Sequence, residues 1–330
     1  MTGLRVIDCG SGTTVQDRGR FGLRRYGVST SGTMDIDSAA LANALTGNLP
    51  EMACIEFQMA GGRFVVEGGQ AVMALSGPGC MLRIGGYSVP DGCSAKGEPG
   101  DVIEVGPVRG GVFAYLAAGG GFDLPGMMGS LSVHRRSGIG GRALAPGDLL
   151  PFKSPDRGKL SRSAPASAIA GPIRLVHGPQ HDHFAAEALE FLSGSPFAVR
   201  PDSDRMACRL DGPPLLHKGE ANIVSDGVLA GSIQVPGDGI PTILLRDCQT
   251  TGGYPKIATV ISADLGRLAQ VAPGGIVHFS SVTPEEAVDA ARTAAKRLRE
   301  RISAIRHVRT EPTTESLLGT NLVGGVTDGR

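Results

Sequence analysis

Glycine constrains this chain more than any other residue, because the 330 residues include 50 glycines together with 22 prolines. That glycine content is far above the usual share of roughly 7% and follows no collagen-like period. Short apolar runs separated by Gly or Pro are typical of β-sandwiches and β-barrels. The sequence therefore predicts a mainly β fold with a few helices and many tight turns.

One short pattern recurs in both halves of the chain: a Pro-Gly turn followed by an alternating strand, at 99–105, 146–152 and 273–279. Pro presets φ at the first central position of such a turn, and Gly accepts the positive φ that follows. The recurrence predicts two related β-barrel-like domains. We expect a β-rich N-terminal domain at 1–160, a linker within 153–171 and a second barrel-like domain at 171–283.

The clearest predicted helix is the last one, at 284–306. Thr283 and Glu286 form a capping box, and Pro284 stands at the first helical position. Shorter helices are predicted at 35–45, 184–192 and 262–270, and further strands at 173–177, 222–224, 231–235 and 243–245. The polar, Gly-rich stretch at 307–330 is predicted to be a flexible tail.

Charge and cysteine usage limit the function classes. Lys plus Arg and Asp plus Glu both total 32, which disfavours a nucleic-acid partner. None of the six cysteines forms a CxxC pair, so we expect reduced thiols. The N-terminus lacks the apolar core of a signal peptide, and no apolar run approaches the 20 or so residues of a membrane helix. These features predict a cytoplasmic protein.

Several standard motifs are missing. The sequence contains no Walker A loop, no complete GxGxxG after a strand and no GxSxG elbow. A nucleotide site would therefore use other geometry or lie partly on a partner. His177, His181 and His183 lie close together in the sequence, but no CxxC or HExxH motif supports a metal. We expect surface or internally bonded histidines and no metal site.

The segment 246–258 carries the richest set of polar groups. It follows an apolar strand and combines amide and hydroxyl groups, two flexible glycines, a phenol and a movable charge: Gln249, Thr250, Thr251, Gly252, Gly253, Tyr254 and Lys256. Such a set suits the binding of a small polar amide or carboxylate. A Gly-Gly turn with internally bonded hydroxyls is the structural alternative.

Two further residues are predicted to face the same cleft. Gln234 lies on a neighbouring strand, and Arg205 is the best candidate for a carboxylate or phosphate clamp, because guanidinium binds oxyanions in a bidentate manner. A plain salt bridge is the alternative for Arg205.

A second polar and Gly-rich segment precedes the first helix. Its candidate residues are Gln16, Asp17, Arg20, Ser31 and Asp35. They form either a surface for a ligand or partner, or a capped loop whose side chains bond to one another.

In order along the chain, these segments resemble a known family. Its N-terminal motifs are matched by Val15-Gln-Asp-Arg-Gly-Arg-Phe-Gly, by Ser31-Gly-Thr-Met-Asp and by Ser137-Gly-Ile-Gly-Gly-Arg. Its C-terminal motifs are matched by Ser203-Asp-Arg-Met, by Gly231-Ser-Ile-Gln-Val-Pro and by Gln249-Thr-Thr-Gly-Gly-Tyr-Pro-Lys-Ile-Ala. The resemblance, from about residue 4 to residue 290, is to the biotin-dependent carboxyltransferase or allophanate hydrolase subunit two family, which includes KipA-like proteins and the C subunit of 5-oxoprolinase. The family is similar to part of the carboxyltransferase region of urea carboxylase.

The resemblance implies two cyclophilin-like β-barrel domains, a KipI-like partner and a LamB/YcsF-like partner. The implied reaction is ATP-dependent opening of 5-oxoproline to glutamate. We expect phosphorylation of the amide oxygen and then hydrolysis, with Arg205, Lys256 and the Gly252-Gly253 backbone holding the charged intermediate. Arg205, Lys256 and Tyr254 are the expected catalytic residues. The chain shows no nucleophile–base pair of its own, so we expect it to be inactive alone.

Two alternatives stay open. One is a carboxyltransferase half-site for urea-like acceptors, with biotin carried by another protein because no Ala-Met-Lys-Met site is present. The other is a non-catalytic KipA-like regulator that binds a KipI-like kinase inhibitor. The chain also departs from the family pattern at Ala207 and Cys208, where Gly and Tyr are usual, so the substrate is left open.

Overall fold

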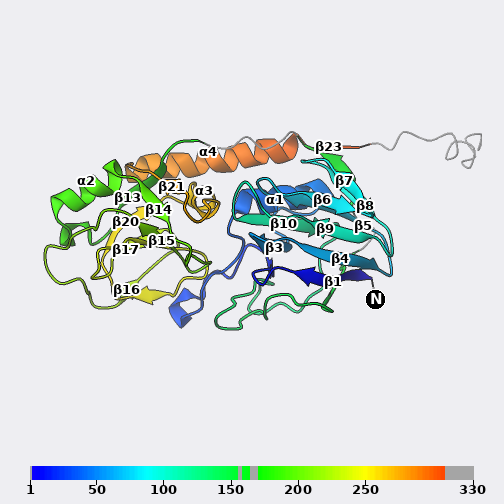
Figure 1. Cartoon of the computed structure of the whole chain (residues 1–330), viewed down its shortest axis with the longest axis horizontal. Helices are drawn as coiled ribbons and strands as arrows, with labels where there is room; N and C mark the ends of the chain where they lie inside the picture. Colours follow the sequence, from blue (N-terminus) through cyan, green and yellow to red (C-terminus); the bar gives the residue numbers. More distant parts are fainter. Residues whose placement is uncertain (1, 155–157, 164–169, 309–330) are drawn as a thin grey trace, which may run out of the picture.

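The computed structural model describes residues 2–154, 158–163 and 170–308. These residues are mainly β with four α-helices, as predicted, and their strands form two β-rich units joined side by side beneath one long helix (Figure 1). Parts of the predicted linker, at 155–157 and 164–169, and nearly all of the predicted tail, at 309–330, lie outside the described residues.

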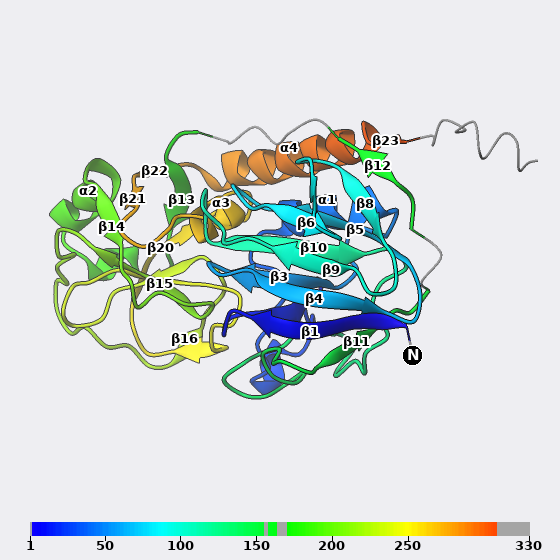
Figure 2. The same cartoon turned by 45° about the vertical axis from the view of Figure 1, so that its right-hand side comes forward.

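The N-terminal unit consists of two sheets that enclose a hydrophobic core (Figure 2). One sheet has the order β11-β1-β4-β9-β6-β7 and the other β2-β3-β10-β5-β8. The strands are β1 (Gly3–Cys9), β2 (Thr14–Gln16), β3 (Cys54–Gln58), β4 (Gly62–Glu67), β5 (Ala71–Ser76), β6 (Leu82–Ile84), β7 (Tyr87–Val89), β8 (Ser94–Gly97), β9 (Val102–Val105), β10 (Phe113–Ala118) and β11 (Leu149–Pro151). A short 3-10 helix, η1 (Arg24–Tyr26), precedes α1 (Ile36–Thr46).

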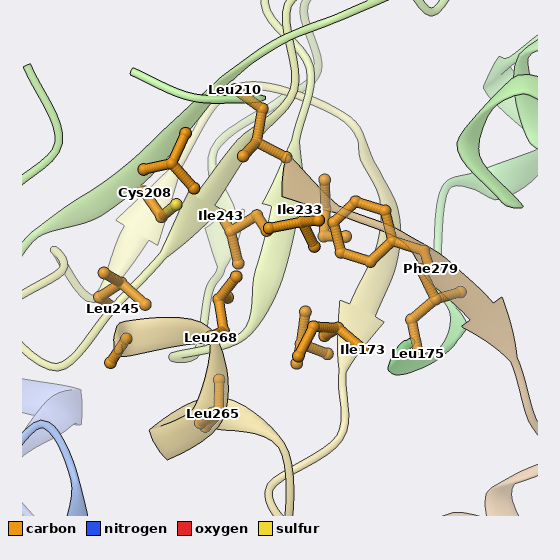
Figure 3. Close-up of a cluster of buried hydrophobic side chains, with 14 of the residues drawn as sticks. Ile173, Leu175, Cys208, Leu210, Ile233, Ile243, Leu245, Leu265, Leu268 and Phe279 are labelled. Carbon is orange, nitrogen blue, oxygen red and sulfur yellow. The ribbon is translucent and has the colours of Figure 1, made fainter. Parts of the chain in front are cut away.

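The C-terminal unit is a nearly closed barrel of eight strands in the order β21-β14-β15-β18-β17-β20-β13-β22. Its elements are β13 (Ile173–His177), η3 (His181–His183), α2 (Ala186–Gly194), β14 (Phe197–Val199), β15 (Ala207–Asp211), β17 (Ser232–Gln234), β18 (Thr242–Leu244), β20 (Lys256–Val260), α3 (Leu265–Ala269), β21 (Ile276–Val277) and β22 (Phe279–Ser281). A separate ribbon pairs β16 (Asp226–Gly227) with β19 (Thr251–Gly252). Apolar side chains from the barrel strands and from α3 converge on one interior (Figure 3).

The Pro-Gly turns adopt the predicted backbone. Gly100, Gly147 and Gly274 all have positive φ, at 94°, 88° and 80°. They precede β9 and β11 in the N-terminal unit and β21 in the C-terminal unit. The repeated sequence pattern is therefore a repeated turn geometry.

The helix ends also follow from the sequence. Asp35 caps α1 by accepting a hydrogen bond from the Ser38 N–H, and Gly47 ends the helix with a left-handed φ of 82°. The helix α4 (Pro284–Ser303) begins with the predicted capping box of Thr283 and Glu286.

One element prediction is wrong: 222–224 is not a strand, and Val224 is 92% exposed. The Ile223 N–H instead donates to the Gly253 carbonyl. This segment therefore serves as a loop beside the β16–β19 ribbon.

The two units share a junction. One cluster of buried apolar residues contains Met34 and Tyr115 of the N-terminal unit together with Leu265 and Leu268 of α3. The helix α4 runs along both units, in contact with α1 and β13 (Figure 1). Beyond it, β23 (Arg306–His307) pairs with β12 (Ser161–Arg162). No helix in the described part of the chain is both long and apolar enough to span a bilayer.

Candidate functional site

A cleft of about 410 Å³ opens on the C-terminal unit, between the turn at 200–206, strands β15, β17 and β18, and the segment 249–254. Five of the predicted residues line it: Gln234, Gln249, Gly252, Gly253 and Tyr254. Arg136 reaches it from the N-terminal unit. The structure therefore brings most of the predicted binding segment to one concave surface, of a size suited to a small ligand.

At the back of the cleft, Gly252 leaves space for the side chain of Gln234. The Gln234 side chain on β17 is buried, and its Nε2 donates to the Tyr254 carbonyl oxygen at 3.3 Å. A Cβ at Gly252 would lie 2.5 Å from that same Nε2. Glycine at 252 thus leaves room for the Gln234 amide, while the Tyr254 side chain lies partly exposed at the rim.

The remaining polar groups of this segment are divided between the cleft and the backbone. Gln249 is exposed at the cleft, and its backbone carbonyl accepts a hydrogen bond from the Arg24 guanidinium at 3.1 Å. Thr250 and Thr251 do not line the cleft; the Thr250 carbonyl accepts from the Val228 N–H, and Thr251 pairs with Gly227 in the ribbon. These two threonines therefore hold the ribbon in place.

Lys256 lies behind the cleft rather than in it. Its side chain is 3% exposed, and its Nζ donates to the Asp226 carboxylate at 2.6 Å and to the Gly227 carbonyl at 3.2 Å. The hydrogen bond from Lys256 lowers the pKa of Asp226 below its ordinary value. Lys256 thus anchors the β16–β19 ribbon, whose far strand supplies Gly252.

Arg205 lies at the junction between the two units. Its guanidinium donates to both Asp247 oxygens, at 2.8 and 3.1 Å, to Glu56 and to the Gly32 carbonyl at 2.7 Å. These contacts occupy four of the five guanidinium donors in a fully buried setting. The geometry is the salt bridge that was the alternative interpretation of the sequence. Arg205 itself does not line the cleft, whereas its neighbours Asp204, Met206 and Ala207 do.

The carboxylate of Glu56, beside Arg205, has a further hydrogen-bond partner. Burial raises the pKa of Glu56, although Arg205 and the hydroxyl of Tyr115 stabilise its charged form. The Tyr115 hydroxyl also accepts a hydrogen bond from the Asp35 N–H at 2.8 Å, at the start of α1. This buried cluster therefore connects the floor of the cleft to the first helix of the other unit.

The charges that face the cleft are ones that the sequence reasoning did not select. Arg136 pairs with Asp204 at 2.9 Å, and Asp202 pairs with Arg200 at 3.0 Å and Arg209 at 3.3 Å. All five line the cleft. The alternation of Arg, Asp and Asp at 200, 202 and 204 before a strand was the available signal. Guanidinium groups at a cleft rim can bind a carboxylate in bidentate fashion.

The residues predicted from the N-terminal loop lie elsewhere. Asp17 accepts four hydrogen bonds, from the Gly19 and Leu131 N–H groups and from the hydroxyls of Ser130 and Ser132. Asp35 caps α1 and accepts from Gln270 at 2.9 Å. For these two carboxylates the structure shows internal bonding.

Gln16, Arg20 and Ser31 of the same loop are fully buried, and none of them lines the cleft. Each keeps a side-chain atom without a hydrogen-bond partner in the described structure.

Of the two residues that depart from the family pattern, Ala207 lines the cleft and Cys208 belongs to the core. Cys208 is packed among apolar side chains of the barrel (Figure 3), and burial raises the pKa of its thiol to about 12. The thiol is therefore protonated near neutral pH and turned away from the cleft. His181 bonds to the Gly178 carbonyl, and within the described ranges no group of three or more His, Cys, Asp or Glu is arranged to hold a metal ion.

Comparisons with known proteins identify the family of this chain. Residues 26–281 match the family model described as "Carboxyltransferase domain, subdomain A and B". The chain is 36% identical over 292 residues to the C subunit of 5-oxoprolinase from Escherichia coli, covering 87% of this chain and 94% of the relative. It is 30% identical to urea amidolyase of Saccharomyces cerevisiae, covering 86% of this chain but only 17% of that protein. The crystal structure of Kluyveromyces lactis urea carboxylase matches with a TM-score of 0.83 at 26% identity, over 94% of this chain and 31% of that one.

Proposed function

This chain belongs to the carboxyltransferase domain family, and we propose that it is one component of an ATP-dependent lactam hydrolase of the 5-oxoprolinase type. The observation that carries the proposal is the 36% identity to the E. coli 5-oxoprolinase C subunit across nearly the full length of both chains. That relative is by its name one part of a larger assembly. We propose a KipI-like and a LamB/YcsF-like protein as the other two components.

The cleft supports a small amide or lactam that carries a carboxylate. Arg200, Arg209 and Arg136 line one part of it. Their guanidinium groups are paired with Asp202 and Asp204 but keep further N–H donors for a substrate carboxylate. The Gln234 amide and the Gly252-Gly253 backbone line another part and suit an amide group. In this proposal these residues bind and orient the substrate. Arg205 and Lys256 act as positioning residues, because they fix the junction and the ribbon that form the cleft wall.

The cleft does not fit a magnesium nucleotide by itself. Two of its three carboxylates, Asp202 and Asp204, are already paired with arginines, and the third, Asp238, accepts a hydrogen bond from the Ile240 N–H, which opposes metal binding there. We therefore propose that ATP is bound by the assembled complex, at a site shared with or supplied by a partner. The part of this chain is to hold the lactam and exclude water from it.

The test is glutamate formation from 5-oxoproline and ATP, with this chain alone and with both partners. We expect glutamate only from the full set. Gln234→Ala and Arg209→Ala should each lower kcat/KM at least tenfold while the complex still assembles. Arg299→Ala, on the exposed face of α4, should have no effect. An assembled complex that forms no glutamate would overturn the proposed reaction.

One observation favours a second candidate, a carboxyltransferase half-site. The match to urea carboxylase covers 94% of this chain with a TM-score of 0.83. In that case carboxylated biotin on another protein would donate carboxylate to a urea-like acceptor in the same cleft. Transfer of labelled carboxylate from carboxybiotin to urea, without ATP hydrolysis by this chain, separates this candidate from the lactam hydrolase.

A further inference from the structure

Arg20 is a fully buried guanidinium that has no ion-pair partner in the described part of the chain. Its side chain is 1% exposed. Nε donates to the Met127 carbonyl at 3.1 Å and Nη2 donates to the Ser132 carbonyl, but Nη1 has no partner among the described residues. Burial lowers the pKa of Arg20, because neutral carbonyl groups replace water around a positive charge.

The nearest carboxylates are committed to other groups. Asp17 accepts four hydrogen bonds from backbone and hydroxyl donors, and Asp247 holds Arg205 in a bidentate pair. Both favour the charged form of Arg20 through space only. A buried charge without a direct counter-charge is costly, so proteins normally pair it. The Arg20 guanidinium is therefore bonded only to backbone carbonyls in the described structure.

Two more buried polar groups, Gln16 and Ser31, each have an unpartnered side-chain atom and lie next to backbone groups that Arg20 contacts. Gln16 Nε2 donates to the Val133 carbonyl, next to the Ser132 carbonyl that binds Arg20, and Gln16 Oε1 is left without a partner in the described structure. The Arg20 N–H donates to the Thr30 carbonyl, which places Ser31 alongside, and among the described residues Ser31 Oγ also lacks a partner. Native structures leave few such atoms unsatisfied, and in the described structure four of them, including Thr13 Oγ1, fall within residues 13–31.

The backbone around Ser31 is strained. Ser31 has a φ of 54°, which is uncommon for a residue with a Cβ, and Gly32 follows with a φ of 92°. Strain of this kind persists where the surrounding structure holds it, and it gathers at ligand sites. At Ser31 it fixes the position of a hydroxyl that has nothing to bond in the described structure.

A glycine-rich turn covers Arg20. Gly138, Gly140 and Gly141 all have positive φ, and a Cβ at Gly140 would lie 2.5 Å from Arg20 Nη2. The same turn carries the exposed Ser137, and Arg136 just before it lines the cleft. The backbone at Gly140 therefore packs directly against the Arg20 guanidinium, with no room for a side chain between them.

We propose that Arg20, with Ser31 and Gln16, forms a binding site for a small oxyanion, a carboxylate, carbonate or phosphate group, beneath the turn 137–141. Nη1 of Arg20 and the Ser31 hydroxyl donate to the anion, and Gln16 Oε1 accepts from its protonated oxygen where one is present. The site is separate from the cleft, whose lining includes none of these three residues. It does not rest on the proposed reaction.

The test measures thermal unfolding of the isolated chain in sodium bicarbonate, sodium acetate or sodium phosphate, each against sodium chloride at equal ionic strength. A ligand that binds only the folded state raises Tm with its concentration. We expect at least one oxyanion to raise Tm by a few degrees over chloride at about 20 mM. Which of the three does so identifies carboxylate, carbonate or phosphate as the bound class.

Three variants make the test specific. Arg20→Gln should abolish the oxyanion-dependent rise in Tm. Ser31→Gly relieves the positive φ, so it should fold, and it should weaken the oxyanion at least fivefold by isothermal titration. Arg18→Gln changes an exposed arginine two residues away and should respond as the wild type does. Equal Tm values in oxyanion and chloride, or a rise that survives both Arg20→Gln and Ser31→Gly, would overturn the site.

Discussion

At two glycines of the C-terminal unit, the atoms that an added Cβ would contact decide whether a substitution affects function or stability. At Gly252 a Cβ would meet the end of the Gln234 side chain, which can move. At Gly231, where φ is 98°, a Cβ would lie 2.6 Å from the Val260 carbonyl oxygen on the barrel wall. The same substitution should therefore affect function at one position and stability at the other.

We expect Gly252→Ala to lower the free energy of unfolding by less than about 1 kcal/mol while it weakens ligand binding in the cleft. Gly231→Ala should cost about 1–3 kcal/mol because of its strained φ. Urea unfolding of both variants, with 5-oxoproline turnover by the assembled complex, measures the contrast. A Gly252→Ala variant with unchanged turnover would show that the Gln234 amide does not contact substrate.

Arg205 gives the second contrast at the residue scale. Arg205→Ala removes the partner of two buried carboxylates and should lower the free energy of unfolding by about 3–5 kcal/mol. Arg292→Ala removes an exposed helix-surface arginine and serves as the control, with little expected change. The urea midpoint of each variant gives the comparison. Equal midpoints would mean that Glu56 and Asp247 are stable without their guanidinium.

The sequence predicted which residues lie near the cleft better than it predicted which way their side chains point. Gln234, Gly252 and Tyr254 were predicted to meet, and they do. Lys256 and Arg205 are close in sequence to residues that line the cleft, but their side chains point into the protein. Carboxylates from other segments bind them there. Direction depends on partners such as Glu56, which lies 149 positions before Arg205, and local patterns do not reveal such partners.

At the scale of elements, Asp264 joins α3 to the barrel. Its carboxylate accepts from the Arg174 backbone and guanidinium at 2.8–2.9 Å and pairs with Arg267 at 3.1 Å. Burial raises the pKa of Asp264, but the hydrogen bonds from both arginines outweigh it, so the folded-state pKa lies below the ordinary value. This carboxylate therefore contributes stability above the unfolded-state pKa of about 3.9.

That contribution should be lost as the pH falls below about 4, through the folded-state pKa. We expect the free energy of unfolding of Asp264→Asn to be lower than that of the wild type at about pH 6, and the gap to narrow at lower pH. Urea unfolding across this range measures it, with Asp289→Asn on the exposed face of α4 as control. A gap that stays constant with pH would contradict the assigned role.

Local chemistry explains which elements the sequence predicts well. The caps of α1 and α4 and the Pro-Gly turns are decided by neighbours within about four residues, and all of them are present. The segment 222–224 has apolar residues that suit a strand, yet its observed backbone partner is a loop carbonyl at Gly253. Strand formation needs a partner strand, and the sequence does not supply its position.

At the scale of the whole molecule, hydrogen bonds, an ion pair and apolar contacts hold the two units together at their junction. Gln270 at the end of α3 accepts from the Val112 and Phe113 N–H groups and donates to the Asp35 carboxylate and the Phe113 carbonyl, all at 2.9 Å. The Arg205–Glu56 pair and a shared apolar cluster connect the same two units. Separating the units would expose these buried groups together.

We therefore expect one cooperative thermal transition for the whole chain, with equal calorimetric and van't Hoff enthalpies. Differential scanning calorimetry tests this. Gln270→Ala leaves two backbone N–H groups of the N-terminal unit unsatisfied and should lower Tm without splitting the transition. Two separate transitions in the wild type would show that each unit folds independently of the junction.

The barrel has a further consequence for the behaviour of the chain in a crowded solution. Its two outermost strands, β21 and β22, are consecutive in sequence and have only His278 between them. They are two and three residues long. An exposed sheet edge invites strands from other molecules to pair with it, and short edges limit that pairing. The way this barrel closes therefore also protects the chain against intermolecular β-aggregation.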